Sequence, residues 1–296
     1  MSDLTIVPAK PGEFAELARL IEVQNRVPET QCLHSGEHAD EVEAVLKQPE
    51  APIFMIARNG DVLAGAFGCE VDGESRGYLQ GPFIAADDYT TVANELWQAL
   101  YAATPSVARY DAFVNVRNEN AAAFLAAAGF RRSQGAQVYV LPAASLPALN
   151  APPAELFTDR YQAGVRALHD LAFPDSPETI EPFMSGQNGN RRLFVFSDGD
   201  RCLGYVAASV NDNPREGYID LLAVDASIRN QGYGRRLLLT AAHWLIEEKS
   251  MPQVGLTVLD MRSDTRELYA RTGFQLLYSG VGYFRQARNS RVESYS

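Results

Sequence analysis

Two glycines separated by one residue, Gly232 and Gly234, mark the start of a long amphipathic helix pattern. The preceding apolar run ends at Val224, and a short bend leads from it to Arg229. No Ser, Thr, Asp or Asn stands at the expected N-cap, so the first N–H groups of the helix lack a side-chain acceptor. Glycine lets a ligand approach the backbone closely, and the helix dipole favours an anion at this end. The spacing predicts a phosphate-binding turn.

Arginine side chains flank the two glycines, with Arg229 before them and Arg235 and Arg236 after them. Three guanidinium groups within eight residues stand out in a chain whose net charge is -11. They favour a diphosphate over a single carboxylate, because each can donate paired hydrogen bonds to phosphate oxygens. The third glycine of the dinucleotide fingerprint and the lysine of the Walker pattern are both absent, so the turn favours neither NAD nor ATP.

The segment VDASIRNQGYG resembles the R/Q-x-x-G-x-G/A signature of the GNAT superfamily of N-acyltransferases, and the later ELYARTGF resembles the family's L-Y-x-x-x-G-F ending. The resemblance covers the C-terminal half of the chain and, in a weaker form, the N-terminal half. It implies that acetyl-CoA is the co-substrate and that its pyrophosphate lies in a loop made by Arg229, Asn230, Gln231, Gly232, Tyr233, Gly234 and Arg235. It also implies that the pantetheine arm pairs with the backbone of Leu222, Ala223 and Val224, one of whose N–H groups reaches the thioester oxygen.

Tyr269 lies in the family-like ending and is the candidate general acid. The resemblance places a tyrosine here near the thioester sulfur, where a phenol with a pKa near its ordinary value of about 10 is protonated at neutral pH and can donate to the leaving thiolate. The alternative is a tyrosine that only packs inside the protein.

Asp220 is the candidate base for the acceptor amine, acting directly or through a water. In the family, a base often lies on this strand. Strand alternation predicts that Tyr218, Asp220, Leu222 and Val224 point to one face. The alternative for Asp220 is a buried carboxylate that accepts hydrogen bonds from backbone amides.

The order of predicted elements occurs twice: a helix, two strands joined by a turn, a third strand, a long helix, another strand and a short helix. The short helices end at Gly129-Phe130 and at Gly273-Phe274, 144 residues apart, which indicates two copies of one domain. We expect an α/β fold (α+β in some schemes) of two GNAT-like domains, each a mixed, mostly antiparallel sheet flanked by helices. A proline- and alanine-rich stretch predicts a semi-rigid linker at 143–153 between a domain at 1–142 and a catalytic domain at 154–296.

The N-terminal copy lacks the chemistry of the C-terminal one. Aligning Ile84 with Val224 puts Tyr89, Val92 and Asn94 at the signature positions, adds Asp87 and Asp88 where a diphosphate would lie, and puts Leu125 in place of Tyr269. We interpret this copy as structural or substrate-shaping. The C-terminal copy itself departs from the family at Arg262 and Thr265, where asparagine and alanine are usual.

Composition excludes several classes of function. The net charge of -11 disfavours nucleic acid and anionic membranes as partners. Cys32, Cys69 and Cys202 form no CxxC pair, so neither a zinc site nor a disulfide framework is expected, and we expect no metal. The chain shows no leader pattern and no long apolar run, which favours a cytoplasmic location.

These observations predict an acetyl-CoA-dependent N-acetyltransferase in which a primary amine of a small molecule or peptide attacks the thioester directly. A homodimer is compatible with the sequence. Two alternatives stay open. One is a non-catalytic CoA-binding or regulatory module, and the other is a transferase of another acyl group with the two-copy plan of mycothiol synthase.

Overall fold

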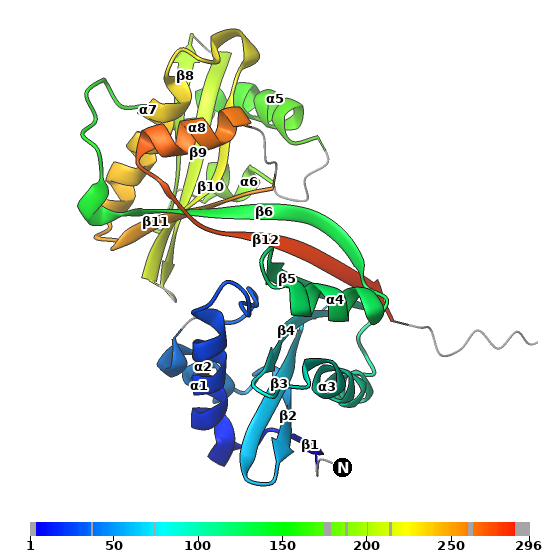
Figure 1. The fold of residues 1–296 in the computed structure, drawn as a ribbon. Coiled ribbons are helices and arrows are strands. Elements are labelled where there is room, and N and C mark those ends of the chain that lie inside the picture. Colours follow the sequence, from blue (N-terminus) through cyan, green and yellow to red (C-terminus); the bar gives the residue numbers. More distant parts are fainter. Residues whose placement is uncertain are drawn as a thin grey trace, which may run out of the picture. The chain divides into compact units, whose positions relative to one another are not determined.

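A computed structural model describes residues 4–36, 38–73, 75–174, 179–186, 189–199, 201–212, 215–259 and 263–287 (Figure 1). The chain divides into two compact units. Unit 1 contains residues 1–136 and 278–296, and unit 2 contains residues 137–277. Each unit has a sheet flanked by helices, so we describe them one at a time.

Unit 1 has a six-strand sheet in the order β1-β2-β3-β4-β5-β12, in which only the β4–β5 pair is parallel. Its helices cover a single apolar core that includes residues of each of the α-helices α1 to α4. The elements are β1 (Leu4–Pro8), η1 (Pro11–Glu13), α1 (Phe14–Asn25), α2 (Ala39–Leu46), β2 (Ile53–Asn59), β3 (Val62–Val71), β4 (Arg76–Ile84), α3 (Tyr89–Ala103), β5 (Arg109–Asn115), α4 (Glu119–Ala127) and β12 (Gln275–Gln286).

Unit 2 repeats this plan with the order β7-β8-β9-β10-β11-β6, in which only the β10–β11 pair is parallel. The prediction of two mixed, mostly antiparallel sheets flanked by helices is confirmed. The elements are β6 (Arg131–Pro142), η2 (Ala143–Ser145), β7 (Glu155–Leu156), η3 (Asp159–Tyr161), α5 (Gln162–Ala172), α6 (Glu181–Ser185), β8 (Arg191–Asp198), β9 (Arg201–Asp212), β10 (Arg215–Val224), η4 (Ala226–Ile228), α7 (Tyr233–His243), the π-helical η5 (Trp244–Glu248), β11 (Gln253–Val258) and α8 (Ser263–Thr272).

The last strand of each sequence half completes the sheet of the other half. Strand β12, which follows α8, pairs with β5 from Gly280↔Asn115 to Gln286↔Arg109. Strand β6, which follows α4, pairs with β11 from Gln253↔Pro142 to Val258↔Gln137. The expected domains at 1–142 and 154–296 keep each last strand with its own half, and the structure exchanges them. Both copies offer the same antiparallel edge, so either last strand can satisfy the backbone groups of either sheet.

The stretch expected as a linker is fastened to helix α7. After η2, residues 146–154, here called the strap, have no regular secondary structure apart from one bend. Arg236 Nη2 donates to the Pro152 carbonyl at 2.8 Å, and His243 Nε2 lies 3.0 Å from the Pro147 carbonyl. The N–H of Ala154 donates to Thr240 Oγ1 at 3.0 Å. Because 236, 240 and 243 lie on one face of α7, the strap follows that helix rather than spanning solvent.

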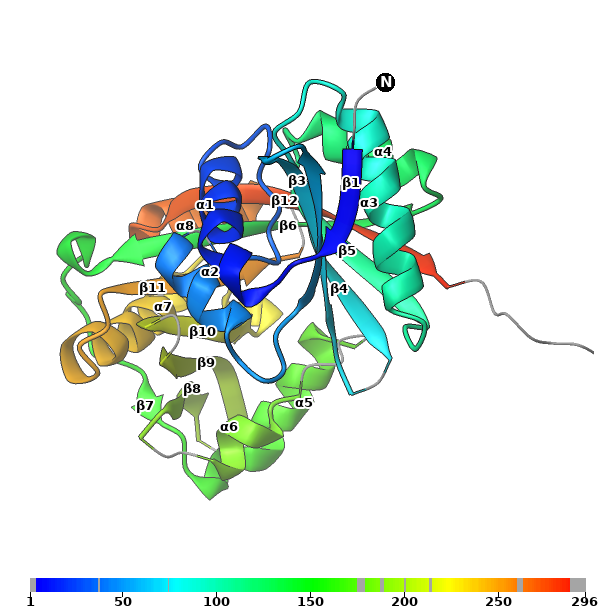
Figure 2. The same ribbon diagram turned by 90° about the horizontal axis from the view of Figure 1, so that it is seen from below.

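Helices α7 and α8 lie on one side of the unit 2 sheet and helices α5 and α6 on the other (Figure 2). Two apolar clusters cover the faces of this sheet. One contains residues of α7 and α8, and the other contains residues of α5 and α6. Strand β10 contributes side chains to both, so its end toward α7 is buried between the two layers. No helix in the described part of the chain combines the length and apolarity needed to cross a membrane.

Candidate active site

The turn between β10 and α7 has the backbone conformation that its glycine predicts. Asn230 and Gly232 both have left-handed backbone, with φ of 61° and 86°. Gly232 is the N-cap of α7 and offers no side-chain cap, as the sequence predicts. The first helical hydrogen bond runs from the Arg236 N–H to the Gly232 carbonyl at 3.1 Å. The N–H groups of Tyr233, Gly234 and Arg235 have no hydrogen-bond acceptor among the described residues. They are the donors that an anion at this helix end would use.

The two glycines serve different purposes. A Cβ on Gly232 would meet no atom within 4 Å, so this position needs glycine for its positive φ and faces open space. A Cβ on Gly234 would lie 3.4 Å from Leu268 Cδ2 and 3.7 Å from Val224 Cγ2. Gly234 therefore marks the close approach of α7 to α8 and to the end of β10.

The three arginines do not act as one group. Arg229 Nε donates to the Val224 carbonyl at 3.2 Å, and Arg235 Nε donates to the Arg271 carbonyl at 3.2 Å, so both stay beside the turn. Arg236 lies against the strap instead, with its guanidinium carbon 4.4 Å from the centroid of the Phe196 ring. Because its side chain is held by both a carbonyl and an aromatic face, we expect Arg236 to contribute less to a phosphate site than Arg229 and Arg235 do.

An aspartate that the sequence analysis did not single out fixes the bend before the turn. Asp225 accepts hydrogen bonds from the N–H and Oγ of Ser227 at 2.8 and 2.6 Å, and it forms an ion pair with Arg201 at 2.7 Å. The Ser227 hydroxyl and the Arg201 guanidinium hold the pKa of Asp225 well below its usual range. The Asp-x-Ser spacing is the local signal that could have identified this turn.

Strands β10 and β11 separate just before the residues expected to hold the donor. Their pairing runs from Gly217↔Val254 to Ile219↔Leu256 and stops there. Strand β10 continues to Val224 beside β9, and β11 continues to Val258 beside β6. We call the end of the Ile219↔Leu256 pairing the fork. A fork of this kind leaves one edge of β10 without a strand partner in the described chain.

The backbone groups at this edge follow from alternation. The Asp225 N–H donates to the carbonyl of Leu203, near the start of β9, at 2.8 Å. Successive residues of a strand point their N–H and C=O to opposite sides, so Val224 and Leu222 point theirs away from β9 and toward the fork. Ala223 directs its own groups toward Tyr205 of β9. Of the three residues expected to meet the pantetheine arm, Leu222 and Val224 thus direct their backbone groups toward the fork, and Ala223 does not.

A β-bulge changes which side chains share a face. The β10–β9 register shifts between Ile219 and Leu221, with Asp220 as the extra residue. Ile219, Leu222 and Val224 pack with the α7 cluster, whereas Leu221 and Ala223 pack with the α5 cluster.

The expectation that Tyr218 shares a face with Leu222 and Val224 is wrong, because the bulge reverses the alternation. Tyr218 lies on the opposite face, where its hydroxyl donates to Thr257 Oγ1 at 2.6 Å. Asp220 is half-buried within the bulge, at the level of the fork.

Tyr269 is buried in α8 among aromatic rings. Its residue is 8% exposed, and its ring centroid lies 5.2 Å from that of Tyr139 and 6.1 Å from that of Phe274. Burial raises the pKa of Tyr269 to about 12, so the phenol keeps its proton at neutral pH and can act only as a donor. Arg262 lies outside the described residues, and so does the side chain of Thr265.

The cysteines offer no nucleophile for a covalent intermediate. All three thiols are buried. Burial raises the pKa of Cys32 and Cys69 to about 12 and that of Cys202 to about 11, which keeps them as unreactive thiols.

The corresponding fork in unit 1 is filled by the chain itself. Pairing of β4 with β5 ends at Leu79↔Ala112. Beyond it, the Leu33 N–H donates to the Phe113 carbonyl at 2.8 Å, and the Asn115 N–H donates to the Gln31 carbonyl at 3.1 Å. The thiol of Cys32 lies 4.0 Å from the Pro82 carbonyl of β4. Residues 31–33 therefore occupy the space between β4 and β5, and Pro82, aligned with Leu222, has no N–H to offer.

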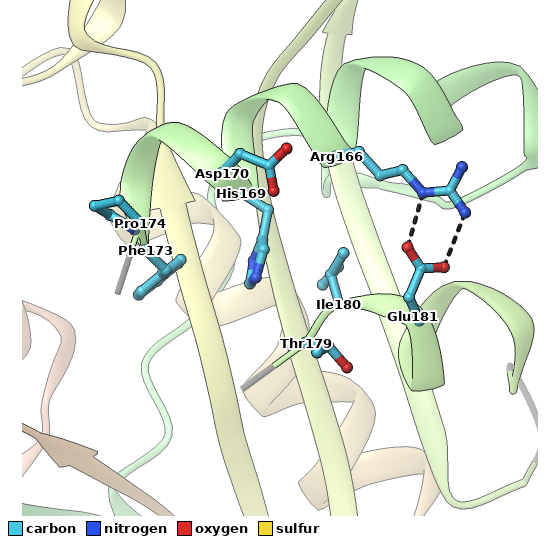
Figure 3. Close-up of a pocket in the computed structure, with 8 residues that line it drawn as sticks. All are labelled: Arg166, His169, Asp170, Phe173, Pro174, Thr179, Ile180 and Glu181. Atoms are coloured by element: carbon cyan, nitrogen blue, oxygen red, sulfur yellow. Dashed lines mark hydrogen bonds and ion pairs between the residues drawn. The ribbon is translucent and has the colours of Figure 1, made fainter. Parts of the chain in front are cut away.

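A pocket of about 510 Å³ lies between α5 and α6 (Figure 3). At its base is His169, 7% exposed, whose Nδ1 lies 2.7 Å from the Tyr205 hydroxyl. Tyr205 pairs in register with Ala223 of β10, so the pocket lies on the α5 face of the strand that forms the fork. No motif in the sequence pointed to this pocket, because its two helices are brought together only by the fold. The lining residues are Arg166, His169, Asp170, Phe173, Pro174, Thr179, Ile180 and Glu181.

Comparison with known proteins agrees with this geometry. Residues 156–274 match the model of the acetyltransferase (GNAT) family. No curated protein matches the sequence. The chain therefore carries a GNAT acetyltransferase domain in its C-terminal half, which assigns that half to the acyltransferase class of enzymes.

Solved structures share the fold over nearly the whole chain. A GCN5-related N-acetyltransferase from Sphaerobacter thermophilus is 15% identical, with a TM-score of 0.68 over 96% of this chain and 95% of that one. A tandem GNAT protein from the clavulanic acid biosynthesis pathway is 17% identical, with a TM-score of 0.58 over 98% of this chain and 100% of that one. A Pyrococcus horikoshii protein described as a putative acetyltransferase is 12% identical, with a TM-score of 0.52 over 97% of this chain and 91% of that one.

Proposed function

We propose that unit 2 transfers an acetyl group from acetyl-CoA to a primary amine. The observation that carries this proposal is the bare start of α7: three backbone N–H groups after a left-handed Gly232, beside Arg229 and Arg235. In this arrangement the diphosphate takes the N–H groups, and the arginines balance its charge. The pantetheine arm then extends along the edge of β10 and pairs with Leu222 and Val224.

The proposed reaction is a direct attack. The amine nitrogen attacks the thioester carbon, a backbone N–H at the β10 edge stabilises the developing oxyanion, and the carbon–sulfur bond breaks. Tyr269 gives its proton to the leaving sulfur, so CoA departs as a thiol. An acceptor that arrives as ammonium first loses a proton to Asp220, or to a water held by it, which passes the proton to solvent. After the attack the nitrogen loses a second proton, and this one balances the proton that Tyr269 supplied. With its pKa raised to about 12, Tyr269 enters the reaction as the neutral phenol, which is the form that holds a proton to donate.

We place the acceptor on the α5 face, in the pocket above Tyr205. Two carboxylates line the pocket: Glu181 is held by Arg166 through bonds of 2.8 and 2.9 Å, and Asp170 lies one turn further along α5 (Figure 3). These negative charges attract an ammonium group before it loses its proton. Phe173 and Ile180 supply the apolar wall that an aliphatic amine needs. We propose that unit 1 binds no donor, because its own residues 31–33 fill its fork.

The test is release of free thiol from acetyl-CoA in the presence of a panel of primary amines, with the acetylated product identified by mass. Tyr269→Phe should lower kcat by ~100-fold and leave the donor Kd within about twofold, because it removes only the proton donor. Binding of acetyl-CoA without thiol release for every amine would instead support the non-catalytic CoA-binding module. Equal kcat for Tyr269→Phe and the natural protein would remove Tyr269 from the mechanism.

A further inference from the structure

The strand exchange places a residue of the N-terminal sequence half next to the proposed acid. Tyr139 of β6 pairs with Leu256 of β11. Leu256 is also the partner of Ile219 in the last pairing before the fork. Tyr139 therefore lies one strand away from the point where β10 and β11 separate. Its side chain belongs to the same apolar cluster as Tyr269 and faces α7 and α8.

Two contacts hold the Tyr139 side chain in place, one from its ring to Tyr269 and one from its hydroxyl to Gln137. Its centroid lies 5.2 Å from the Tyr269 ring, with an angle of 43° between the planes. Its hydroxyl donates to Gln137 Oε1 at 3.0 Å. Tyr139 and Gln137 are each 5% exposed, and Gln137 pairs with Val258, so the tether is held by the same exchanged strand. A buried phenol with a bonded hydroxyl has little freedom to rotate.

We propose that Tyr139 is a positioning residue for Tyr269, and that the N-terminal sequence half contributes to catalysis through this strand. The inference rests on the proposed function, in which Tyr269 is the acid. Tyr139 and Phe274 both contact the Tyr269 ring, with centroids 5.2 and 6.1 Å away, and these contacts restrict the movement of that ring. A proton donor must lie within hydrogen-bond reach of the departing sulfur, so a ring free to tilt would donate less often.

The contact between Tyr139 and Tyr269 also differs from the packing expected within a single copy of the domain. Phe274 comes from the same sequence half as Tyr269 and follows it closely, so it would be present in any GNAT copy that ends in Gly-Phe. Tyr139 reaches this place only because β6 crosses into unit 2. Unit 1 has Leu125 at the position aligned with Tyr269, so it has no phenol there to position.

The experiment is a double-mutant cycle on the full chain, with acetyl-CoA and an amine that the natural protein acetylates. Tyr139→Leu should lower kcat by ~10-fold and leave the KM for acetyl-CoA within about twofold. The same substitution in the Tyr269→Phe background should have no further effect, because there is no acid left to position. Tyr139→Phe, which keeps the ring and loses the Gln137 tether, should lower kcat by ~3-fold. Tyr161→Phe is the control, since it removes a buried tyrosine hydroxyl from the other cluster of unit 2.

A readout independent of turnover completes the test. With ring-labelled tyrosine, the NMR signals of Tyr269 are assigned by their loss in Tyr269→Phe. They should shift and show faster ring rotation in Tyr139→Leu, and stay unchanged in Tyr161→Phe. The inference falls if Tyr269 signals are unchanged in Tyr139→Leu, or if Tyr139→Leu lowers kcat equally in both backgrounds. The proposed function fails separately, when the natural protein releases no thiol or when Tyr269→Phe retains full activity.

Discussion

Helices α7 and α3 follow equivalent strands, β10 and β4, in the two units, yet the N–H groups of their first turns have different acceptors. Helix α7 starts at Gly232, whose missing side chain leaves the first N–H groups to an external anion. Helix α3 starts at Asp88, whose carboxylate accepts the Thr91 N–H at 3.1 Å. The positive end of the helix dipole is left open to an external ligand at α7, whereas at α3 it interacts with the Asp88 carboxylate.

The forks differ in the same sense. In unit 2 the edge of β10 offers the backbone of Leu222 and Val224, while in unit 1 the corresponding space holds residues 31–33. The two sheets nevertheless have the same strand order and the same single parallel pair. If unit 2 binds the donor as proposed, the difference means that the fold alone does not make a donor site. The site depends on leaving a helix end and a strand edge without partners from the chain itself.

The strongest test of this comparison gives α7 the cap that α3 has. Gly232→Asp should weaken acetyl-CoA binding by ~100-fold, because a carboxylate would occupy the N–H groups and repel the diphosphate. Isothermal titration calorimetry measures the affinity. Gly232→Asn is the matched control, since asparagine tolerates a positive φ and adds no charge, and it should cost ~5-fold or less.

Thermal unfolding separates this effect from misfolding. Both variants place a side chain at a φ of 86°, so both should lower the Tm to a similar extent, whereas only Gly232→Asp should lose most of the affinity. An unchanged affinity in Gly232→Asp would mean that the diphosphate does not lie at this turn.

A smaller effect distinguishes the two neighbouring arginines of α7. Arg235→Gln should weaken acetyl-CoA binding by ~10-fold at low salt and by less at high salt, because a phosphate contact is screened. Arg236→Gln should change the affinity by less than about twofold and lower the Tm instead, because Arg236 holds the strap and not the ligand. Equal losses of affinity in both variants would contradict the assignment of Arg236 to the strap.

The smallest expected effect concerns the cap of α3. Hydrogen bonds from Thr91 lower the pKa of Asp88. Its stabilising effect is therefore present above the ordinary carboxyl pKa of about 4 and is lost as pH falls through the lowered pKa. Asp88→Ala should lower the Tm by about 2–4 °C at neutral pH, and this difference should vanish in acid. Calorimetry should still find one acetyl-CoA per chain, because residues 31–33 continue to fill the fork; a second bound donor would overturn our account of unit 1.

Local features of the site were predictable from the sequence, because they depend on neighbouring residues. The left-handed turn at Gly232, the absence of a side-chain cap on α7 and the acidic start of α3 all follow from the types of adjacent residues. The element order of both copies follows from hydrophobic periodicity.

The remaining features depend on pairings between distant segments. The bulge at Asp220 and the fork appear only when β10 is placed between β9 and β11. The direction of Tyr218 was mispredicted for this reason, since one extra residue reverses strand alternation. The filling of the unit 1 fork joins residues 31–33 to β5, far along the chain. Nothing local in those residues marks them as a strand partner.

The exchange of last strands has a consequence for the order in which the protein is made. Strand β12 follows α8 in sequence, so a ribosome completes all of unit 2 before it supplies the partner of β5. During that interval, the edge of β5 that β12 will cover keeps its backbone groups exposed to water and to other nascent chains. The half that is translated first is thus the half that finishes folding last. Its sheet is completed only when strand β12 arrives from the end of the enzyme half.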